Sequence, residues 1–524
     1  MAAVAAFAET ITAPSISIRA ARASEAKHAF CSAVLLKRQE RCQFTGASRR
    51  AAGRAYTSPL KRSIERVAPA GFSWSHNWNR GSYGKEKFRA QTVATDSIVS
   101  GNGAAGAEED LLASALIDAN GSSVIEDCGK GLPEKRQATN AVHGGERREP
   151  FVTDALTTPI VQTATYTFKD TAQLIAFQDG THSSYEYGRY GNPTTRVVEQ
   201  KISALEGAED TLVSSSGMNS ATTMLLALVP DGGHIVTTTD CYRRTRQFIQ
   251  TVLPRMGIST TVIDPSDMAS LERTLDEHDV TLFFSESPTN PYLRCIDIEL
   301  VSQMCHERGT LVCIDGTFAT PINQQAIPLG ADLVLHSATK YLAGHQDVLA
   351  GSLSGRKPEV AKVRQLHNVL GGVVDSHAAY LILRGMKTLD LRVHKQNQTA
   401  LRLAEALESH PKISRVHYPG LTSHPEHDIA RRQMKGYGGV VSFEINGDLW
   451  RTAKFIDSLR LPYIAPSLGG VESLVEQPTI ISYWDYGPEE RARLGIKDNL
   501  VRFSCGIEDY DDIAEDMFRG LDSI

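Results

Sequence analysis

From about residue 137 onward the sequence alternates short, apolar, β-rich runs with stretches of helical pattern, and this alternation constrains the fold more than any other feature. The predicted strands are 211–213, 234–238, 281–284, 310–314 and 332–335. Helices are expected between them, for example at 219–229 and 246–255. Short strands separated by helices indicate βαβ units and a mostly parallel sheet. The sequence therefore predicts an α/β fold.

Beyond residue 390 the mixture of patterns changes. The predicted elements there are helices at 392–409 and 449–459 and strands at 438–445 and 499–504. A chain of 524 residues is also too long for one simple domain, since a domain usually holds roughly 100–200 residues. We therefore expect a large domain over residues 201–389 and a smaller C-terminal α/β domain over residues 390–524.

The first 95 residues differ in composition from the rest. They are rich in Ala, Ser and Arg and contain sixteen Lys or Arg against five Glu and no Asp. This composition is typical of an organelle transit peptide, which is removed from the mature protein. A basic arm that binds nucleic acid is the alternative, but no aromatic–basic alternation or zinc-ligand spacing supports it. Residues 96–136 are predicted to form an acidic, flexible linker.

Several classes of protein are disfavoured by the whole sequence. The formal net charge of −6 argues against a nucleic-acid-binding protein, which usually carries a basic excess. Nothing is expected to span a membrane, because no apolar run reaches the ~18 residues that a spanning helix needs. The cysteines contain no CxxC pair, so we expect buried free thiols in a reducing compartment and no zinc or other metal site. They are Cys31, Cys42, Cys128, Cys241, Cys295, Cys305, Cys313 and Cys505.

Polar residues follow several of the predicted strands at the point where each strand ends. Gly217-Met218 lies at a strand-to-helix junction, where free N–H groups and the helix dipole favour a phosphate. Asp315 closes another strand, and Lys340 follows a third. The hydroxyls of Ser337 and Thr339 flank that lysine and can bind phosphate oxygens. In an open α/β sheet, ligands bind beyond the carboxyl ends of the strands, so these side chains are expected to meet at one site.

An acid and a lysine at neighbouring strand ends suit pyridoxal 5'-phosphate (PLP). This cofactor needs a lysine for its covalent attachment and an anion beside its pyridine nitrogen. The anion, here Asp315, keeps that nitrogen protonated, so the ring can accept electrons. Either residue alone would be structural in most proteins, but the combination with phosphate-binding hydroxyls predicts a PLP enzyme with Lys340 as the attachment point.

Longer motifs around these residues closely resemble the Cys/Met-metabolism family of PLP-dependent enzymes. They are Ser337-Ala338-Thr339-Lys340-Tyr341, Asp315-Gly316-Thr317, Tyr187-Gly188-Arg189-Tyr190-Gly191-Asn192-Pro193-Thr194, Ser216-Gly217-Met218, Glu286-Ser287-Pro288-Thr289-Asn290-Pro291 and Ser467-Leu468-Gly469-Gly470. The resemblance extends from about residue 137 to residue 524. Within the family, the stretches 236–242, 309–321, 462–470 and 483–485 most resemble the plant cystathionine γ-synthases.

This resemblance implies a fold type I, aspartate-aminotransferase-like PLP transferase. Lys340 would hold the cofactor and move protons, Asp315 would pair with the pyridine nitrogen, and Tyr242 would stack on the ring and assist proton transfer. The other cofactor-binding residues that it implies are Gly217, Met218, Ser337 and Thr339 for the phosphate, and Asn290 near the ring. Residues 137–200 would form an arm whose Tyr187 and Arg189 reach the phosphate of the neighbouring subunit's cofactor.

The resemblance also implies the substrates and the reaction. Arg502 would bind the substrate carboxylate as a planar fork, and Ser467 would position Lys340 or the substrate. The reaction would be a γ-replacement in which cysteine and an activated homoserine give cystathionine for methionine biosynthesis. In plant members the activated substrate is O-phosphohomoserine, whereas bacterial relatives use acylated homoserines, and the residue pattern alone does not choose between them. A homotetramer built from two dimers and a chloroplast location, rather than a mitochondrial one, are also implied.

Two alternative functions remain open. A cystathionine or methionine lyase would use the same lysine and aspartate but would release a 2-oxo acid and ammonia. A dimeric scaffold without catalysis is more remote, because Lys340 and Asp315 are both present. Four positions depart from the family pattern without removing a group that the chemistry requires: Asn219, Gln346, Ser376 and Pro466.

Overall fold

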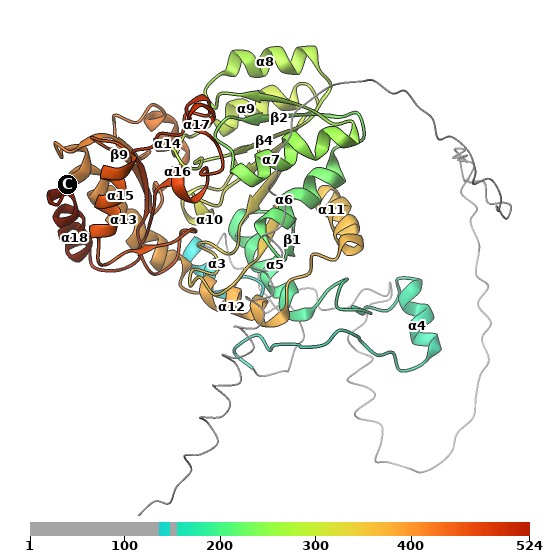
Figure 1. The fold of residues 1–524 in the computed structure, drawn as a ribbon. Coiled ribbons are helices and arrows are strands. Elements are labelled where there is room, and N and C mark those ends of the chain that lie inside the picture. The colour runs from blue at the N-terminus through green and yellow to red at the C-terminus, as the bar shows by residue number, and fades with distance from the viewer. Residues whose placement is uncertain (1–135, 147–154) are drawn as a thin grey trace, which may run out of the picture. The chain divides into compact units, whose positions relative to one another are not determined.

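The computed structural model describes residues 136–146 and 155–524 (Figure 1). The predicted transit peptide at 1–95 and the predicted linker at 96–136, except for its last residue, therefore lie outside the described residues. So do Cys31, Cys42 and Cys128. The other five cysteines are buried and free, as expected. No helix in the described ranges has both the length and the apolar character needed to cross a bilayer.

A seven-stranded sheet forms the centre of the N-terminal half of the described chain. Its strands are β1 (Asp210–Ser214), β2 (His234–Thr238), β3 (Ser259–Ile263), β4 (Val280–Glu286), β5 (Leu311–Asp315), β6 (Leu333–His336) and β7 (Gly351–Gly355). Their order is β1-β7-β6-β5-β4-β2-β3, and only β7 is antiparallel to its neighbours. The predicted parallel sheet is confirmed, and all five predicted strands belong to it. The sequence reasoning missed β3 and β7.

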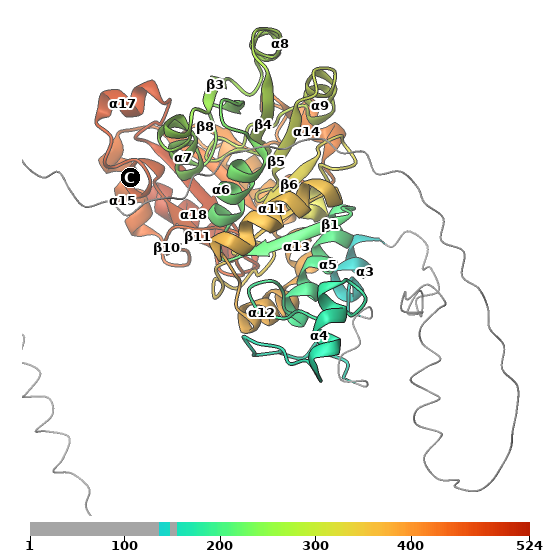
Figure 2. The same ribbon diagram turned by 90° about the vertical axis from the view of Figure 1, so that its right-hand side faces the viewer.

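Helices cover both faces of this sheet (Figure 2). One face packs against α6 (Gly217–Leu228), α7 (Arg243–Thr251) and α11 (Lys357–Leu370), and the other against α8 (Met268–Glu277) and α9 (Ile298–His306). Successive residues of β4 alternate between the two cores: Leu282 and Phe284 belong to the first, and Phe283 to the second. The strands are apolar on both faces because both faces are covered. The predicted helix 246–255 starts earlier than expected, at Arg243, and a 3-10 turn (Leu253–Met256) follows it.

A second sheet has the order β10-β11-β12-β9-β8. Its strands are β8 (Ile413–His417), β9 (Val440–Ile445), β10 (Tyr463–Ile464), β11 (Leu474–Glu476) and β12 (Leu500–Ser504). The helices α13 (Leu389–Glu408), α15 (Leu449–Ser458) and α18 (Tyr510–Asp522) pack around it, at the left of the view in Figure 1. The four elements predicted beyond residue 390 are confirmed to within a few residues as α13, β9, α15 and β12.

Eight further helices lie in the described ranges. They are α3 (Gln137–His143), α4 (Thr171–Gln178), α5 (Pro193–Glu206), α10 (Thr320–Asn323), α12 (Ser376–Met386), α14 (His427–Gln433), α16 (Pro478–Ile481) and α17 (Pro488–Arg493). Local chemistry defines their ends. In α5 the Asn192 side chain accepts hydrogen bonds from the N–H groups of Thr194 and Thr195, and Pro193 occupies the first turn. Gly207 then ends the helix in the left-handed conformation.

The segment around α4 stands apart from both sheets in the two views (Figures 1 and 2). None of the residues of α4 is buried, and its apolar side chains Leu174 and Ile175 are both exposed. Leu156, upstream in the same segment, is 92% exposed. The segment lies within the predicted arm at 137–200.

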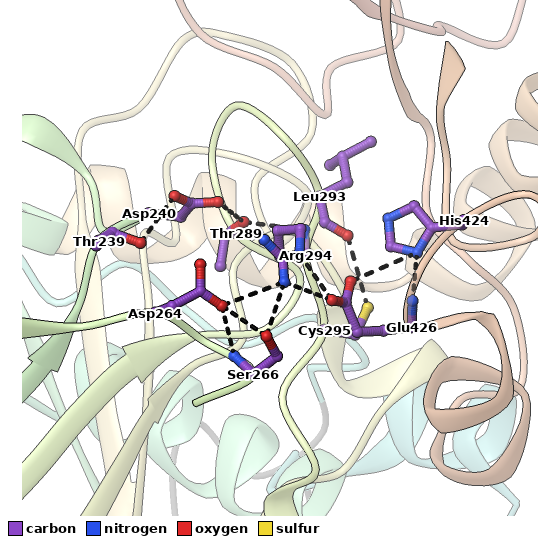
Figure 3. A network of polar contacts seen from close by, with 10 residues as sticks. All are labelled: Thr239, Asp240, Asp264, Ser266, Thr289, Leu293, Arg294, Cys295, His424 and Glu426. Atoms are coloured by element: carbon purple, nitrogen blue, oxygen red, sulfur yellow. Dashed lines mark hydrogen bonds and ion pairs between the residues drawn. The ribbon is translucent and has the colours of Figure 1, made fainter. Parts of the chain in front are cut away.

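A polar network joins the loop that follows β4 to the C-terminal part of the chain (Figure 3). The guanidinium group of Arg294 lies 2.6 Å from the carboxylate of Glu426 and 3.4 Å from that of Asp264. The loop closes on itself, because Thr289 N–H donates to Arg294 C=O and Arg294 N–H donates to the Thr289 hydroxyl. Arg294 therefore fixes the loop that also carries Asn290.

Candidate active site

One cavity of about 600 Å³ lies beyond the carboxyl ends of the large sheet, where residues of the second sheet close it. Its size is in the usual range for a small-molecule site. Ten of the twelve predicted site residues line it: Gly217, Met218, Tyr242, Asn290, Asp315, Ser337, Thr339, Lys340, Ser467 and Arg502. Tyr187 and Arg189 do not. The cavity also contains Glu286, Thr317 and Glu476, which the sequence reasoning did not select.

The first turn of α6 forms one wall of the cavity. Ser216 caps the helix, and its hydroxyl accepts a hydrogen bond from Asn219 N–H. A Cβ atom on Gly217 would come within 3.0 Å of the Cβ of Ser337, so only glycine allows these segments to approach so closely. The opening N–H groups of a helix have no intrahelical partner and favour an anion. This wall is suited to a phosphate group, with the Ser337 side chain beside it.

Asp315 lies at the end of β5 and is held by the residue two positions later. Its Oδ1 accepts hydrogen bonds from Thr317 N–H at 2.9 Å and from the Thr317 hydroxyl at 2.5 Å. That hydroxyl in turn accepts from Ser337 N–H. Burial raises the pKa of the Asp315 carboxyl, and the two bonds from Thr317 oppose the rise. A cation beside Asp315 would stabilise its charged form.

Lys340 follows β6 and projects into the cavity. Its Nζ donates to the Ser467 hydroxyl at 2.7 Å. Burial lowers the pKa of Lys340 to about 8, and the charge of Arg502 contributes to the shift, whereas Glu476 opposes it. About a tenth of this amine is therefore neutral at pH 7, and the neutral amine is the form that acts as a nucleophile or a base.

Thr339 is more tightly engaged than predicted. Its hydroxyl accepts a hydrogen bond from Ala350 N–H and also lies 3.2 Å from Ala350 C=O. These bonds join the lysine turn to the start of β7. A role of Thr339 in binding phosphate stays a prediction.

Arg502 on β12 is held by three oxygen atoms. Its Nη1 donates to Asn290 Oδ1 at 3.0 Å, and its Nη2 donates to Ser467 C=O at 2.9 Å. Nη2 also lies 2.9 Å from Glu476 Oε1 in a buried ion pair. Ser467 contributes its carbonyl from a backbone with φ of 92°, a conformation that is strained for a non-glycine residue. The arginine thus enters the cavity in a fixed orientation.

Tyr242 lies at the start of α7 and keeps 43% of its surface exposed. The next residue, Arg243, pairs with the Asp485 carboxylate and donates to Ser482 C=O. Its guanidinium carbon also lies 4.4 Å from the centre of the Tyr486 ring. These contacts hold the start of α7 against the segment that follows α16.

The match to known proteins decides the family. The family model described as Cys/Met metabolism PLP-dependent enzyme matches residues 138–522. The chain belongs to this family. It is a PLP-dependent enzyme, and the fold type I architecture expected from the motifs is confirmed.

Three relatives show where the chain lies within the family. It is 65% identical over 385 residues to cystathionine γ-synthase 1, chloroplastic, of Nicotiana tabacum. This match covers 73% of this chain and 71% of that protein. It is 38% identical to the L-methionine γ-lyase of Fusobacterium nucleatum subsp. polymorphum, over 74% of this chain and 98% of that one. Among solved structures, cystathionine γ-synthase from Xanthomonas oryzae pv. oryzae, in complex with aminoacrylate and cysteine, superposes with a TM-score of 0.70. It is 34% identical and covers 74% of this chain and 98% of that chain.

The residues of the cavity fit the family's cofactor. The α6 terminus beside Gly217 offers N–H groups to a phosphate, and a side chain at that position would crowd Ser337. The buried carboxyl of Asp315, whose pKa is raised by burial, would be stabilised in its charged form by a protonated pyridine nitrogen. Lys340 supplies an amine of lowered pKa in the same cavity.

Tyr187 and Arg189 lie in the predicted arm, away from the cavity of their own chain. Arg189 donates to Asn368 C=O, and its guanidinium carbon lies 4.8 Å from the centre of the Tyr190 ring. Tyr187 and Tyr190 are both exposed. Their contact with a neighbouring subunit's cofactor stays a prediction.

Proposed function

We propose that this chain is a cystathionine γ-synthase that joins O-phosphohomoserine to L-cysteine, producing L-cystathionine and phosphate. One observation supports it most: Lys340, Asp315 and Arg502 line one cavity, in a chain that is 65% identical to a protein named as that enzyme. The bond from Cγ to the phosphate oxygen breaks, and a bond from Cγ to the cysteine sulfur forms. The thiol proton leaves with the phosphate or enters solvent.

Each side chain has a distinct task. Bound PLP supplies an electron sink that makes the protons at Cα and Cβ of the substrate acidic. Lys340, with a pKa of about 8, is suited to remove and return these protons, and Ser467 keeps its amine in place. Arg502 binds the substrate carboxylate, for which the guanidinium fork offers two parallel donors. Tyr242, at the cavity wall, contacts the cofactor ring.

The proposal includes an assembly and a location. A homotetramer made of two dimers is supported by the exposed apolar side chains of the segment 155–206, which suit burial against another subunit. Residues 1–95 would act as a transit peptide that directs the chain to the chloroplast. The relatives named chloroplastic and the basic composition of these residues support this location.

The test is a product assay on the purified, PLP-loaded chain with O-phosphohomoserine, with and without cysteine. Cystathionine and phosphate are expected in equal amounts only when cysteine is present, and neither is expected with Lys340→Ala. O-Acetylhomoserine and O-succinylhomoserine, supplied in parallel, identify the preferred leaving group. A clear preference for an acylated substrate would contradict the phosphate assignment.

The second candidate is a lyase, because relatives at 38% identity are named L-methionine γ-lyase and cystathionine γ-lyase. A lyase would consume cystathionine or methionine and release a 2-oxo acid and ammonia. If these products form and the synthetic reaction is negligible, the lyase function replaces the proposal. A chain that binds PLP but shows neither reaction would instead be a non-catalytic scaffold.

A further inference from the structure

Glu286 is a buried cavity residue to which the proposed reaction assigns no role. It closes β4 and lies directly opposite Asp315 in the parallel pairing of β4 with β5. Only 4% of its surface is exposed, and it lines the cavity. A carboxylate is costly to bury unless its oxygens are hydrogen-bonded, so its partners indicate why it is present.

The two oxygens of Glu286 accept hydrogen bonds from two different segments. Oε1 accepts from the backbone N–H of Tyr242, at the start of α7. Oε2 accepts from the backbone N–H of Asn290, in the loop after β4, at 3.2 Å. A single carboxylate therefore ties together the segments that carry two predicted site residues.

Each of these segments presents a side chain to the cavity. Tyr242 lines the cavity and is predicted to stack on the cofactor ring. Asn290 Oδ1 accepts from Arg502 Nη1 at 3.0 Å. A continuous path of hydrogen bonds thus runs from Tyr242 through Glu286 and Asn290 to Arg502. Displacing the carboxylate would disturb both the ring contact and the orientation of the arginine.

The chemistry of these donors requires a carboxylate. Both partners are backbone N–H groups, so both oxygens must accept, and only an ionised carboxylate offers two acceptors without a donor. Glutamine would keep one acceptor and would turn an amide N–H against a backbone N–H. Burial and the nearby charge of Asp315 raise the pKa of Glu286 well above its usual range, whereas the bonds from Tyr242 and Asn290 oppose the rise.

We propose that Glu286 is a positioning residue that sets Tyr242 against the cofactor ring and, through Asn290, sets Arg502 for the substrate carboxylate. The inference deepens the proposed function. The kinetic part of its test rests on that function, because it measures KM for the activated homoserine. The spectroscopic part needs only bound PLP, so the failure of one can be distinguished from the failure of the other.

The test compares Glu286→Gln and Glu286→Asp with a matched control, Asp332→Asn. Asp332 is also a buried carboxylate that accepts from a backbone N–H, that of Val312, but it precedes β6 at the opposite end of the strands and lies outside the cavity lining. Thermal unfolding of each holoenzyme reports stability. Visible circular dichroism of the bound cofactor reports the ring environment, and KM and kcat with the activated homoserine report Arg502.

Glu286→Gln is expected to change the visible circular dichroism and to raise KM for the activated homoserine about 10- to 100-fold, the size of a lost buried hydrogen bond. Glu286→Asp keeps the charge but is too short to reach both N–H groups, so we expect it to show the same changes in weaker form. Asp332→Asn is expected to lower the unfolding temperature while the dichroism and KM stay unchanged.

Two outcomes would overturn the inference. One is a Glu286→Gln enzyme with wild-type dichroism and KM. The other is that Asp332→Asn changes both readouts as strongly as Glu286→Gln, which would indicate only a general loss of stability. If Glu286→Gln does not fold, Asn290→Ser supplies the second test. It removes the amide that contacts Arg502 but keeps the backbone N–H that donates to Glu286. KM is therefore expected to rise, and an unchanged KM would contradict the proposed path.

Discussion

Arg502 and Arg294 perform the same structural task at two ends of one loop. Arg502, on β12, donates to Asn290 near the beginning of the loop that follows β4. Arg294, near the end of that loop, pairs with Glu426, which precedes α14. Each arginine therefore links the loop to a C-terminal segment, and each has a buried carboxylate partner.

Their surroundings differ. The Arg502 side chain is 7% exposed, lines the cavity with Lys340 and has Glu476 as its carboxylate partner. The Arg294 side chain is 22% exposed, lies outside the cavity lining and is shared between Glu426 and Asp264 (Figure 3). The comparison indicates that an arginine linking this loop to a C-terminal segment becomes functional when a donor group faces a ligand cavity, and otherwise contributes to stability alone.

The largest effect on activity is expected when Arg502 is replaced. Arg502→Met removes the carboxylate fork and leaves Glu476 buried without its partner, a loss of about 3–5 kcal/mol. We expect kcat/KM to fall about 10²- to 10³-fold, in a steady-state assay with the activated homoserine. Arg502→Lys keeps the charge but not the fork, so an intermediate loss is expected. A decrease of less than threefold for the methionine variant would contradict the role of Arg502.

Arg294→Met is expected to act on stability instead. It leaves the buried Glu426 carboxylate without its cation, and the free energy of unfolding of the holoenzyme should fall by about 1–3 kcal/mol, measured by urea denaturation. The value of kcat/KM should stay within about threefold of the wild type, since Arg294 does not line the cavity. A loss of activity as large as that of Arg502→Met would show that the two arginines cannot be separated in this way.

The burial of Lys340, together with the charge of the neighbouring Arg502, also predicts a pH dependence that Arg294 does not share. Because Lys340 has a pKa of about 8 in the folded chain, the rate of PLP binding to the cofactor-free protein should rise nearly tenfold from pH 6 to pH 7 and level off above about pH 8. The unfolded lysine keeps its proton up to a pH of about 10.5. The cost of this group to stability is therefore complete below pH 8 and fades as the pH rises toward 10.5.

Glu476→Gln tests the electrostatic origin of this pH dependence. Glu476 opposes the lowering of the Lys340 pKa, so its neutralisation should move the pH profile of PLP binding to lower pH. Stopped-flow absorbance of the cofactor-bound protein follows the rate. An unchanged profile, or one shifted to higher pH, would contradict the electrostatic coupling of these three groups.

The smallest effect is expected at a more exposed ion pair between the start of α9 and α14. Arg432 on α14 lies 2.5 Å from Asp297, and its side chain is 49% exposed. Arg432→Met should change the free energy of unfolding by less than about 1 kcal/mol, with no change in kcat/KM. Measured beside Arg294→Met, it tests whether burial of the partner carboxylate determines the size of the effect.

Local patterns in the sequence were sufficient to predict the strands and site residues that depend on interactions between residues close in the sequence. Alternating strand and helix patterns predicted five strands of the large sheet, because buried parallel strands are apolar and bounded by turn residues. The motifs around Lys340 and Asp315 predicted the cofactor, since each lies at the end of a strand that was itself predictable. The strand β7, by contrast, consists of Gly351-Ser352-Leu353-Ser354-Gly355, a composition that rarely forms strands.

Only the tertiary structure explains that strand and the contacts across the cavity. A Cβ atom on Gly351 would come within 2.3 Å of Ser216 C=O. The first residue of β7 is therefore a glycine because the start of α6 packs against it. Glu476 meets Arg502 because β11 and β12 pair antiparallel in that register, 26 residues apart in the sequence. The local sequence determined which residues can perform the chemistry. Strand register and the closure of the two sheets on each other, which depend on contacts between distant segments, decided which partners hold those residues in place.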